Sequence, residues 1–173
     1  EANPPAQCYL LAVDLRKAFD ALSETFMHET LRHFGAPAWA QAVVRALHYD
    51  VTVILDAGAP PHTPATKVTV TRGIKQGSPL SPMLFTIAMD CILRRLAALG
   101  LDVRAFMDDV LLRTSNLGRL IPAMEAIDQF SEYSGLYVNK TKTKLVCTSE
   151  ATAEEDAQWI QERAPWKGLV IAA

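Results

Sequence analysis

The sequence has little of what marks a freestanding nucleic-acid-binding protein, a membrane protein or a secreted one. Lys and Arg number 17 against 19 Asp and Glu, which gives a net charge of −2 and a pI of about 6.1. A freestanding nucleic-acid binder usually carries a basic face and a pI above about 9. The apolar segments are short and interrupted by charges, so we expect no membrane-spanning helix, and no basic-then-apolar signal peptide opens the chain.

Cysteine is also scarce. The three cysteines, Cys8, Cys91 and Cys147, lie far apart without paired spacing, and two of them fall in apolar runs. This pattern argues against a zinc motif and a disulfide framework, and it predicts buried thiols in a reducing compartment.

What the sequence does contain is an ordinary globular composition. Half of the 173 residues are hydrophobic and 21% are charged, which fits one domain, or a large part of one, with a substantial core. Because the first residue is Glu1 and not Met, we expect a piece cut from a longer protein.

The stretch Ala105–Leu112 places two adjacent carboxylates, Asp108 and Asp109, between apolar runs. Two such runs joined by a two-residue polar step predict a tight β-hairpin with both Asp residues at its tip. A plain turn is one interpretation, because Asp is a common turn residue. However, neither Asp is followed by the Gly that the tightest turns prefer, and two neighbouring like charges repel unless a cation relieves them. A metal site is the other interpretation, and it requires a third carboxylate.

Asp14 is the candidate for that carboxylate, because it closes the apolar run Cys8–Leu15, which has the pattern of a buried strand. Asp14 and Asp108 both lie where an apolar strand reaches the surface, and neighbouring strands of one sheet would bring them together. Hard oxygen donors without His or Cys suit Mg²⁺, and two such ions about 3.5–4 Å apart can clamp an in-line phosphoryl displacement. The alternative is a strand-end Asp that caps a turn.

The remaining pattern mixes strands and helices without strict alternation, which predicts an α+β fold with an antiparallel sheet. Ser23 is the expected N-cap of the first helix, and Gly35, Gly100 and Gly135 are expected to end helices. Hydrophobic periodicity sets the other expected elements. The expected helices cover residues 24–34, 37–47, 83–99, 120–134 and 154–163, and the further strands cover 51–55, 67–71, 145–147 and 169–171. The Pro-rich loop Ala57–Ala65, including His62, is expected to be exposed.

Four ordered segments resemble the palm motifs of reverse transcriptases, in a form closest to retroelements without long terminal repeats and to group II intron-type enzymes. They are Asp14–Asp20 (DLRKAFD), Arg72–Phe85 (RGIKQGSPLSPMLF), Phe106–Asp109 (FMDD) and Ser134–Lys144 (SGLYVNKTKTK). The second is the most specific, because Gly, Gln-Gly and Ser-Pro rarely coincide at fixed offsets. The resemblance covers about residues 8–146, and Trp166–Leu169 is a fainter fifth match to the primer-gripping hairpin.

The resemblance implies a polymerase palm: an antiparallel sheet backed by helices, with a ferredoxin-like or RRM-like core. Residues 1–173 would form one partial palm domain, with part of the fingers at about 23–71 and a primer-grip hairpin at about 165–173. Most of the fingers and the thumb would be missing. Because phosphate neutralisation supplies most polymer affinity, their absence would also account for the missing positive charge.

The resemblance also implies catalytic roles. Asp14 and Asp108 would bind two Mg²⁺ ions, for which Mn²⁺ can substitute, with Asp109 as the accompanying carboxylate and the Leu15 carbonyl as a further ligand. Lys142 matches the lysine proposed to protonate the departing pyrophosphate. The alternative is that Lys142 and its neighbouring lysines form a solvated basic face.

Three further residues match substrate-binding positions. Phe19 matches the steric gate, a ring under the sugar that would clash with a 2′-OH, although without the family it would be taken for a core aromatic. Gln76 and Gly77 match the loop that lines the nucleotide pocket. Gly77 permits close backbone approach, and Gln76 can hydrogen-bond the incoming nucleotide or the template.

The implied function is RNA-directed DNA polymerisation: a primer 3′-OH attacks a dNTP and releases pyrophosphate. The implied partners are an RNA template, a DNA or RNA primer, dNTPs, and the missing fingers and thumb. The expected location is intracellular, in the nucleus or cytoplasm of a eukaryote as a ribonucleoprotein, or in a bacterial cytoplasm. We expect the isolated 173 residues to polymerise poorly or not at all.

Two alternatives stay open. The first is a decayed palm that acts as a scaffold, which the joint presence of Asp14, Asp108, Gln76 and Gly77 disfavours. The second is an RNA-dependent RNA polymerase, which usually has an Asp five residues after the first metal-binding Asp, where this chain has Phe19.

Overall fold

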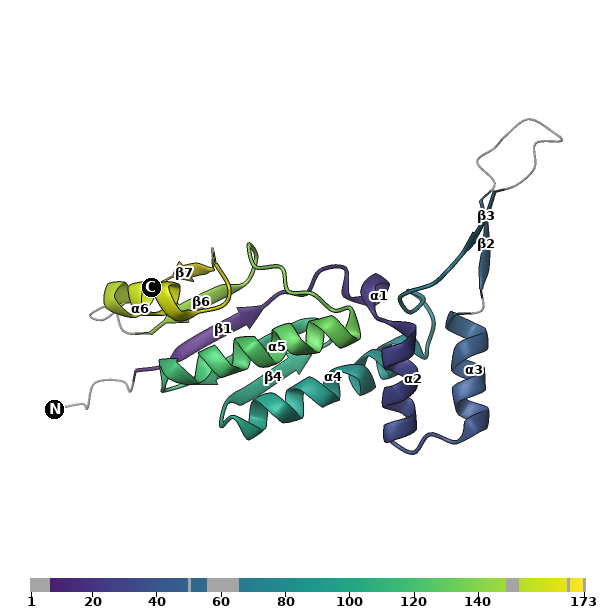
Figure 1. The fold of residues 1–173 in the computed structure, drawn as a ribbon, viewed down its shortest axis with the longest axis horizontal. Coiled ribbons are helices and arrows are strands. Elements are labelled where there is room, and N and C mark those ends of the chain that lie inside the picture. Colours follow the sequence, from purple (N-terminus) through teal and green to yellow (C-terminus); the bar gives the residue numbers. More distant parts are fainter. Residues whose placement is uncertain (1–6, 50, 56–65, 149–152, 168, 173) are drawn as a thin grey trace.

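A computed structural model describes residues 7–49, 51–55, 66–148, 153–167 and 169–172, and it confirms the α+β prediction. The main sheet has the strand order β4-β5-β1-β6-β7 (Figure 1). Its strands are β1 (Tyr9–Val13), β4 (Asp102–Phe106), β5 (Asp109–Thr114), β6 (Lys144–Cys147) and β7 (Val170–Ala172). All pairs are antiparallel except β6–β7.

Two helices connect the first four of these strands. Helix α4 (Ser81–Ala98) precedes β4, and helix α5 (Leu120–Ser134) follows β5 and the short 3₁₀ turn η1 (Leu117–Arg119). The order β1-α4-β4-β5-α5-β6 is the β-α-β-β-α-β arrangement of a ferredoxin-like core. Helix α4 begins two residues earlier than expected because proline is tolerated in the first helical turn, where Pro82 lies.

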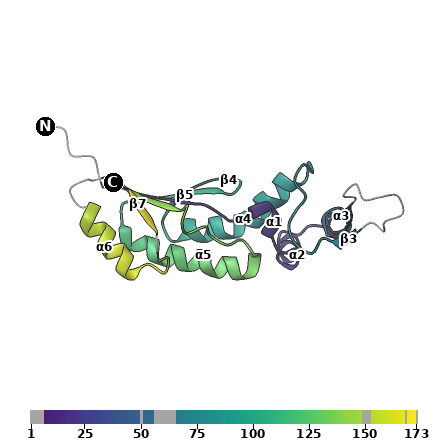
Figure 2. The ribbon, with the colours of Figure 1, turned by 90° about the horizontal axis from the view of Figure 1, so that it is seen from above.

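The main sheet is covered on one face. Helices α4, α5 and α6 (Ala153–Arg163) all lie on the same side of the sheet (Figure 2). The expectation of a fully buried first strand is therefore wrong: in β1, Leu11 is fully buried, whereas Ala12 is exposed. Successive strand residues point to opposite faces, and only one face meets the helices.

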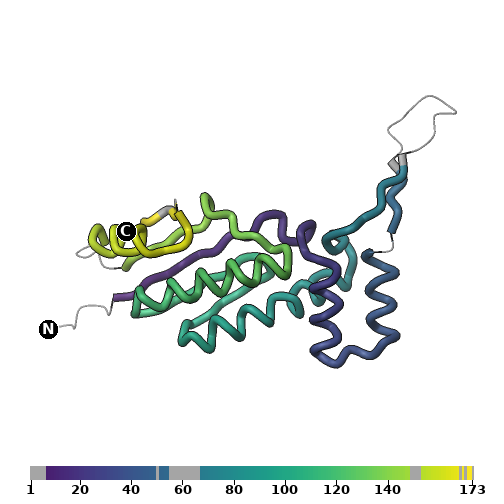
Figure 3. The backbone as a smooth tube through the Cα atoms, in the orientation of Figure 1, coloured from purple at the N-terminus to yellow at the C-terminus, as the bar shows by residue number. Residues whose placement is uncertain are grey.

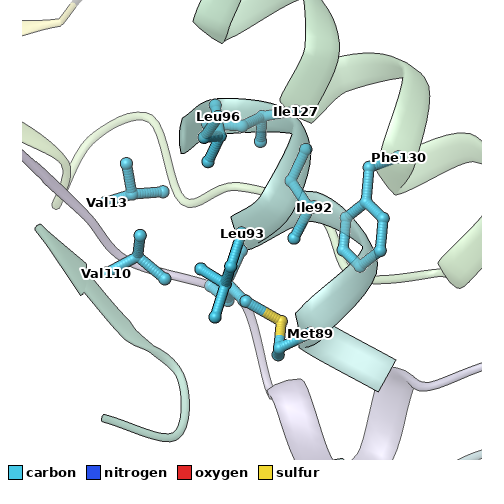
Figure 4. A pocket seen from close by; sticks show the side chains of 9 residues that line it. Val13, Met89, Ile92, Leu93, Leu96, Val110, Ile127 and Phe130 are labelled. Carbon is cyan, nitrogen blue, oxygen red and sulfur yellow. The ribbon is translucent and has the colours of Figure 1, made fainter. Parts of the chain in front are cut away.

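The covered face holds the core. Val13 and Val110 from the sheet meet α4 and α5 residues, including Ile92, Leu96 and Ile127, around an apolar cavity of about 10 Å³ (Figure 4). A cavity of this size holds at most about one water molecule, and its lining offers no polar partner for one. This region is packed core and not a ligand site.

The predicted hairpin is present, but its turn is shifted by one residue. The last cross-strand pair is Phe106–Asp109, so the turn consists of Met107 and Asp108, and Asp109 is the first residue of β5. Met107 has a positive φ of 54°, as the first turn residue of some tight hairpins does. The register is decided by Val110 and Leu112, which are buried on the helix face; a slip by one residue would expose them.

Between β1 and α4 the chain forms an arm. It consists of α1 (Ala18–Ala21), α2 (Glu24–His33), α3 (Ala38–His48), β2 (Thr52–Leu55) and β3 (Thr66–Thr69). The tube in Figure 3 shows the chain leaving the sheet after β1, running through these elements and returning to α4. Ser23 caps α2 as predicted by accepting a hydrogen bond from the Phe26 N–H (3.3 Å), and β2 pairs antiparallel with β3. The loop Ala57–Ala65 with His62 lies outside the described residues.

The C-terminal segment packs against the sheet. Helix α6 has an inner side, on which Ile160 is fully buried. The Tyr9 hydroxyl of β1 donates a hydrogen bond to Asp156 of α6 (3.0 Å), and burial is the main cause that raises the pKa of Tyr9 to about 12. The primer-grip hairpin at about 165–173 stays a prediction; in the described part of it, β7 pairs with β6.

The three cysteines are free, as predicted, but only Cys147 is buried. Cys8 and Cys91 are half-buried, so the expectation of three buried thiols is wrong. Cys8 lies just before β1, beside the Arg113 guanidinium (Nε to Sγ 3.3 Å), and Cys91 lines a surface groove between α2, α4 and α5. Among the described residues, no helix combines the length and the apolar character that a membrane span needs.

Candidate active site

Segments from four parts of the chain line one open pocket of about 640 Å³. The lining residues come from the end of β1 and the start of α1, from the loop before α4, from the β4–β5 turn and from the segment after α5. They are Asp14, Leu15, Arg16, Lys17, Ala21, Arg72, Asp108, Gly135, Tyr137, Asn139 and Lys142. The structure thus brings together four of the predicted site residues, namely Asp14, Leu15, Asp108 and Lys142.

Backbone hydrogen bonds on both sides hold Asp14 in place. Its N–H donates to the Thr143 hydroxyl (3.2 Å), and its C=O accepts from the Asn139 N–H (2.7 Å). Thr143 is fully buried. The segment after α5 therefore fastens the end of β1, where Asp14 lies.

Asp109 lies opposite Asp14 in the register but lines a different pocket. The β1–β5 pairing ends at Val13–Val110, so the next residue toward the hairpin tip is Asp14 on one strand and Asp109 on the other. Asp109 lines a neighbouring pocket of about 420 Å³, together with Phe106. Among the described residues, no three His, Cys, Asp or Glu side chains are grouped closely enough to hold a metal ion.

The donors that converge on the main pocket suit a hard cation. Two carboxylates, Asp14 and Asp108, share it, and no His or Cys lines it. The bridge between Leu15 and Val138 uses the Asp14 C=O and the Arg16 N–H, so it does not use the Leu15 carbonyl. These residues fit Mg²⁺ better than zinc, and their metal-binding role stays a prediction.

The same pocket is lined by cationic residues that have no role in the sequence prediction. Arg16, Lys17 and Arg72 line it together with the predicted Lys142, so four cationic residues and two carboxylates line one pocket. Lys17 has a positive φ of 44°, a conformation that non-glycine residues rarely adopt. The signal was in the sequence, because these residues fall inside the quoted motifs, but their convergence depends on the fold.

The predicted substrate-binding residues lie beside this pocket. Gln76 and Arg72 line an adjoining pocket of about 250 Å³, and Gln76 donates a hydrogen bond from Nε2 to Asp20 Oδ1 (3.2 Å). Arg72 thus lines both pockets. Phe19 is half-buried and stacks on Phe85, with ring centroids 4.8 Å apart. Its ring is partly core, and its role as a steric gate stays a prediction.

Two glycines allow the motifs to meet backbone to backbone. A Cβ on Gly73 would lie 2.7 Å from the Phe19 carbonyl oxygen, and one on Gly135 would lie 2.5 Å from that of Ala21. Both glycines also have a positive φ, at 83° and 77°. The second and fourth motifs therefore pack directly on the first. This close packing is the physical reason why the chain has glycine at these two positions.

A ferredoxin-like sheet with carboxylates and cations at one end is the arrangement of a polymerase palm domain. Comparison with known proteins identifies the family: the family described as reverse transcriptase (RNA-dependent DNA polymerase) matches residues 2–167. The chain belongs to the reverse transcriptase family, as its motifs predict.

The relatives are retrotransposon proteins. The chain is 33% identical over 144 residues to the "Retrovirus-related Pol polyprotein from type-2 retrotransposable element R2DM" of Drosophila melanogaster, and 29% identical over 144 residues to the Pol polyprotein from type-1 retrotransposable element R2 of Popillia japonica. Each alignment covers 78% of this chain but only 13% and 20% of those proteins. The chain thus corresponds to a small part of its relatives.

Solved structures of telomerase have a similar fold. Apo telomerase from Candida tropicalis, truncated from its C-terminal domain, matches with a TM-score of 0.69 at 16% identity, over 85% of this chain and 32% of that one. Telomerase from Candida albicans matches with a TM-score of 0.66 at 18% identity, over 84% and 27%. At this identity the likeness concerns the fold alone.

Proposed function

We propose that this chain is the catalytic palm of a retroelement reverse transcriptase without long terminal repeats, which adds dNTPs to a primer 3′-OH on an RNA template. The observation that carries the proposal is the shared pocket of Asp14 and Asp108, which are distant in sequence, with four cationic side chains around them. Membership of the reverse transcriptase family and the retrotransposon relatives support it.

The reaction is attack of the primer 3′-OH on the α-phosphate of the dNTP, with loss of pyrophosphate. Asp14, Asp108 and the Leu15 carbonyl would hold two Mg²⁺ ions, for which Mn²⁺ could substitute, with Asp109 as the accompanying carboxylate. When bound, these ions supply charge neutralisation at the attacking and leaving oxygens.

The chain's own side chains would bind the triphosphate and manage its charge. Arg16, Lys17 and Arg72 can pair with phosphate oxygens, since charge-assisted hydrogen bonds to phosphate are among the strongest in proteins. Lys142 would give a proton to the departing pyrophosphate. Gln76, beside Arg72, would contact the incoming nucleotide or the template.

The remaining assignments concern the parent protein. The RNA template, the primer, and the fingers and thumb would supply most of the binding surface, because phosphate contacts dominate nucleic-acid affinity. A telomerase that shares this fold is described in complex with a fragment of telomeric RNA. We place the parent protein inside the cell, as a ribonucleoprotein in the nucleus or cytoplasm of a eukaryote or in the cytoplasm of a bacterium.

Replacing Asp108 with Ala tests the catalytic assignment in the full-length protein that carries these residues. We expect primer extension on an RNA template to fall by at least about 10²-fold. The reason is that the pocket loses one of the two carboxylates that would hold the ions and so stabilise the charge of the transition state. The matched control is Asp102→Ala, at the other end of the same hairpin, where the carboxylate is exposed. If the chain is only a scaffold, the wild type, Asp108→Ala and Asp102→Ala will show the same activity. Thermal unfolding checks that each variant is folded.

Replacing Phe19 with Ala tests the sugar gate. In the full-length protein we expect ribonucleotide incorporation to rise at least about tenfold relative to dNTP incorporation, because the ring that meets a 2′-OH is gone. The matched control is Phe26→Ala, a half-buried ring that packs edge-on against Phe130. Unchanged sugar selectivity in Phe19→Ala, or an equal change in Phe26→Ala, would remove the gate assignment.

A further inference from the structure

The loop that carries Gln76 and Gly77 is held by both backbone polar groups of Lys75. The Lys75 N–H donates a hydrogen bond to Nδ1 of His48 (3.1 Å). The Lys75 C=O accepts from the Ser78 N–H (3.3 Å) and from the Ser81 hydroxyl. His48 and Ser81 are both buried, at 0% and 2% exposure, so the Lys75 backbone is anchored to the protein interior through its N–H and through its C=O.

This anchoring determines where Gln76 lies. Residues 75–78 form a β-turn closed by the bond from Ser78 to Lys75, and Gly77 has the positive φ (88°) that a type II turn needs at its third position. Gln76 is the second residue of the turn, so it lies at an exposed tip whose base is the Lys75 backbone. Moving that backbone would move Gln76 away from Asp20, to which it donates a hydrogen bond.

His48 can serve this purpose only as a neutral imidazole. Nδ1 accepts a hydrogen bond from the Lys75 N–H, so it cannot carry a proton itself, and the ring proton lies on Nε2. Nε2 is buried without a hydrogen-bond partner among the residues that the structure describes. Burial and the nearby Lys75 charge lower the pKa of His48, which favours the neutral form.

His48 also connects two regions of the molecule. It is the last residue of α3, 27 positions before Lys75, and it lines the same 250 Å³ pocket as Gln76 and Arg72. The arm is therefore joined to the substrate side of the candidate site through this imidazole.

We propose that His48 is a positioning residue, whose Nδ1 holds the Lys75 N–H so that the Gln76–Gly77 turn is shaped for the incoming deoxynucleotide. This inference rests on the proposed function, since only that function makes the turn a nucleotide site. The hydrogen-bond clamp itself is independent of it.

The test compares His48→Asn with His48→Gln in the full-length protein. The Asn side chain can place its carbonyl oxygen near the position of Nδ1 and keep the acceptor, whereas that of Gln reaches the position of Nε2 and loses it. Amide hydrogen exchange over residues 73–78 should be about five- to tenfold faster in His48→Gln, as expected for one lost hydrogen bond, and near wild type in His48→Asn. His33→Gln, at the exposed end of α2, is the matched control and should change nothing.

The kinetic arm measures primer extension with the same variants. We expect the KM for dNTP to rise about five- to tenfold in His48→Gln, with kcat within about twofold of wild type, and partial or full recovery in His48→Asn. Equal effects of Asn and Gln on exchange would mean that His48 acts by packing alone and would overturn the proposal. Faster exchange without a change in KM would also overturn it. A wild-type protein that does not extend primers would instead refute the proposed function, and the exchange comparison would still decide the clamp.

Discussion

The body of the molecule, which is the main sheet with α4, α5 and α6, buries its apolar side chains far more completely than the outer part of the arm, which is α3, β2 and β3. In the body, facing residues such as Leu11 and Leu112 are fully buried between strand and helix. In the arm, Trp39 of α3 is 71% exposed and Ile54 of β2 is 62% exposed. Figure 1 shows why: the arm extends away from the sheet, and nothing in the described chain lies over its outer side.

This difference teaches where the stability of the fold resides. Burial of apolar area is the main favourable term in folding, so the body carries most of it. The outer part of the arm, which is α3, β2 and β3, contributes local hydrogen bonds and a few buried residues near its base, among them Val44, His48 and Tyr49. The carboxylates are built on the stable body, and the Gln76 turn is built where the body and the arm meet.

The largest expected effect comes from truncating one leucine in the body. Leu112→Ala should lower the free energy of unfolding by about 2–5 kcal/mol, because it leaves a cavity in the sheet–helix core. Trp39→Ala, a larger truncation in the arm, should change it by no more than about 0.5 kcal/mol. Urea unfolding followed by circular dichroism measures both. Similar losses would mean that the arm is as well packed as the body, which would end the comparison.

A pair of glycines sharpens the contrast. Gly135 in the body and Gly35 in the arm have nearly equal positive φ values, at 77° and 75°, so alanine strains the backbone similarly at both. At Gly135 the new Cβ would also lie 2.5 Å from the Ala21 carbonyl oxygen, whereas at Gly35 it would meet nothing within 4 Å. Gly135→Ala should therefore destabilise the protein by about 1–3 kcal/mol more than Gly35→Ala. Equal shifts in denaturation midpoint would contradict this contact.

The smallest expected effect is a pH dependence at the junction. The folded-state pKa of His48 is lowered from its ordinary value of 6.5, by burial first and then by the Lys75 charge. The unfolded state therefore binds a proton more readily, so the contribution of His48 is complete above pH 6.5 and declines as the pH falls from 6.5 toward the folded-state value. Each unit of lowering corresponds to about 1.4 kcal/mol. Unfolding of wild type and His48→Asn should differ in pH dependence below about pH 6.5, and parallel curves would contradict it.

Much of the fold was predictable from sequence because its signals are local. Ser23 as a helix cap and Gly135 as a helix end follow from short-range chemistry, and both lie where expected. The misplaced hairpin turn and the partly exposed β1 have a different cause. Which face of a strand is buried depends on helices far away in sequence, and no local pattern reports that.

The candidate site divides in the same way. The types of its residues, from Asp14 to Lys142, were readable from ordered motifs, together with the family to which the chain belongs. The positions of Arg72 and His48 beside the candidate site were not, because they depend on the loop before α4 meeting the ends of β1 and α3.

The sequence by itself determined the family and the α+β class, and it predicted Asp14, Asp108 and Lys142 of the candidate site, since these follow from residue type and order along the chain. Only the tertiary structure decided that Asp108 shares a pocket with Asp14, that Asp109 lines the neighbouring one, and that His48 holds the turn of Gln76. The physical reason is that register and burial are properties of packed strands and helices: residues distant in sequence are brought within hydrogen-bonding distance only when the whole sheet and its helices exclude water together.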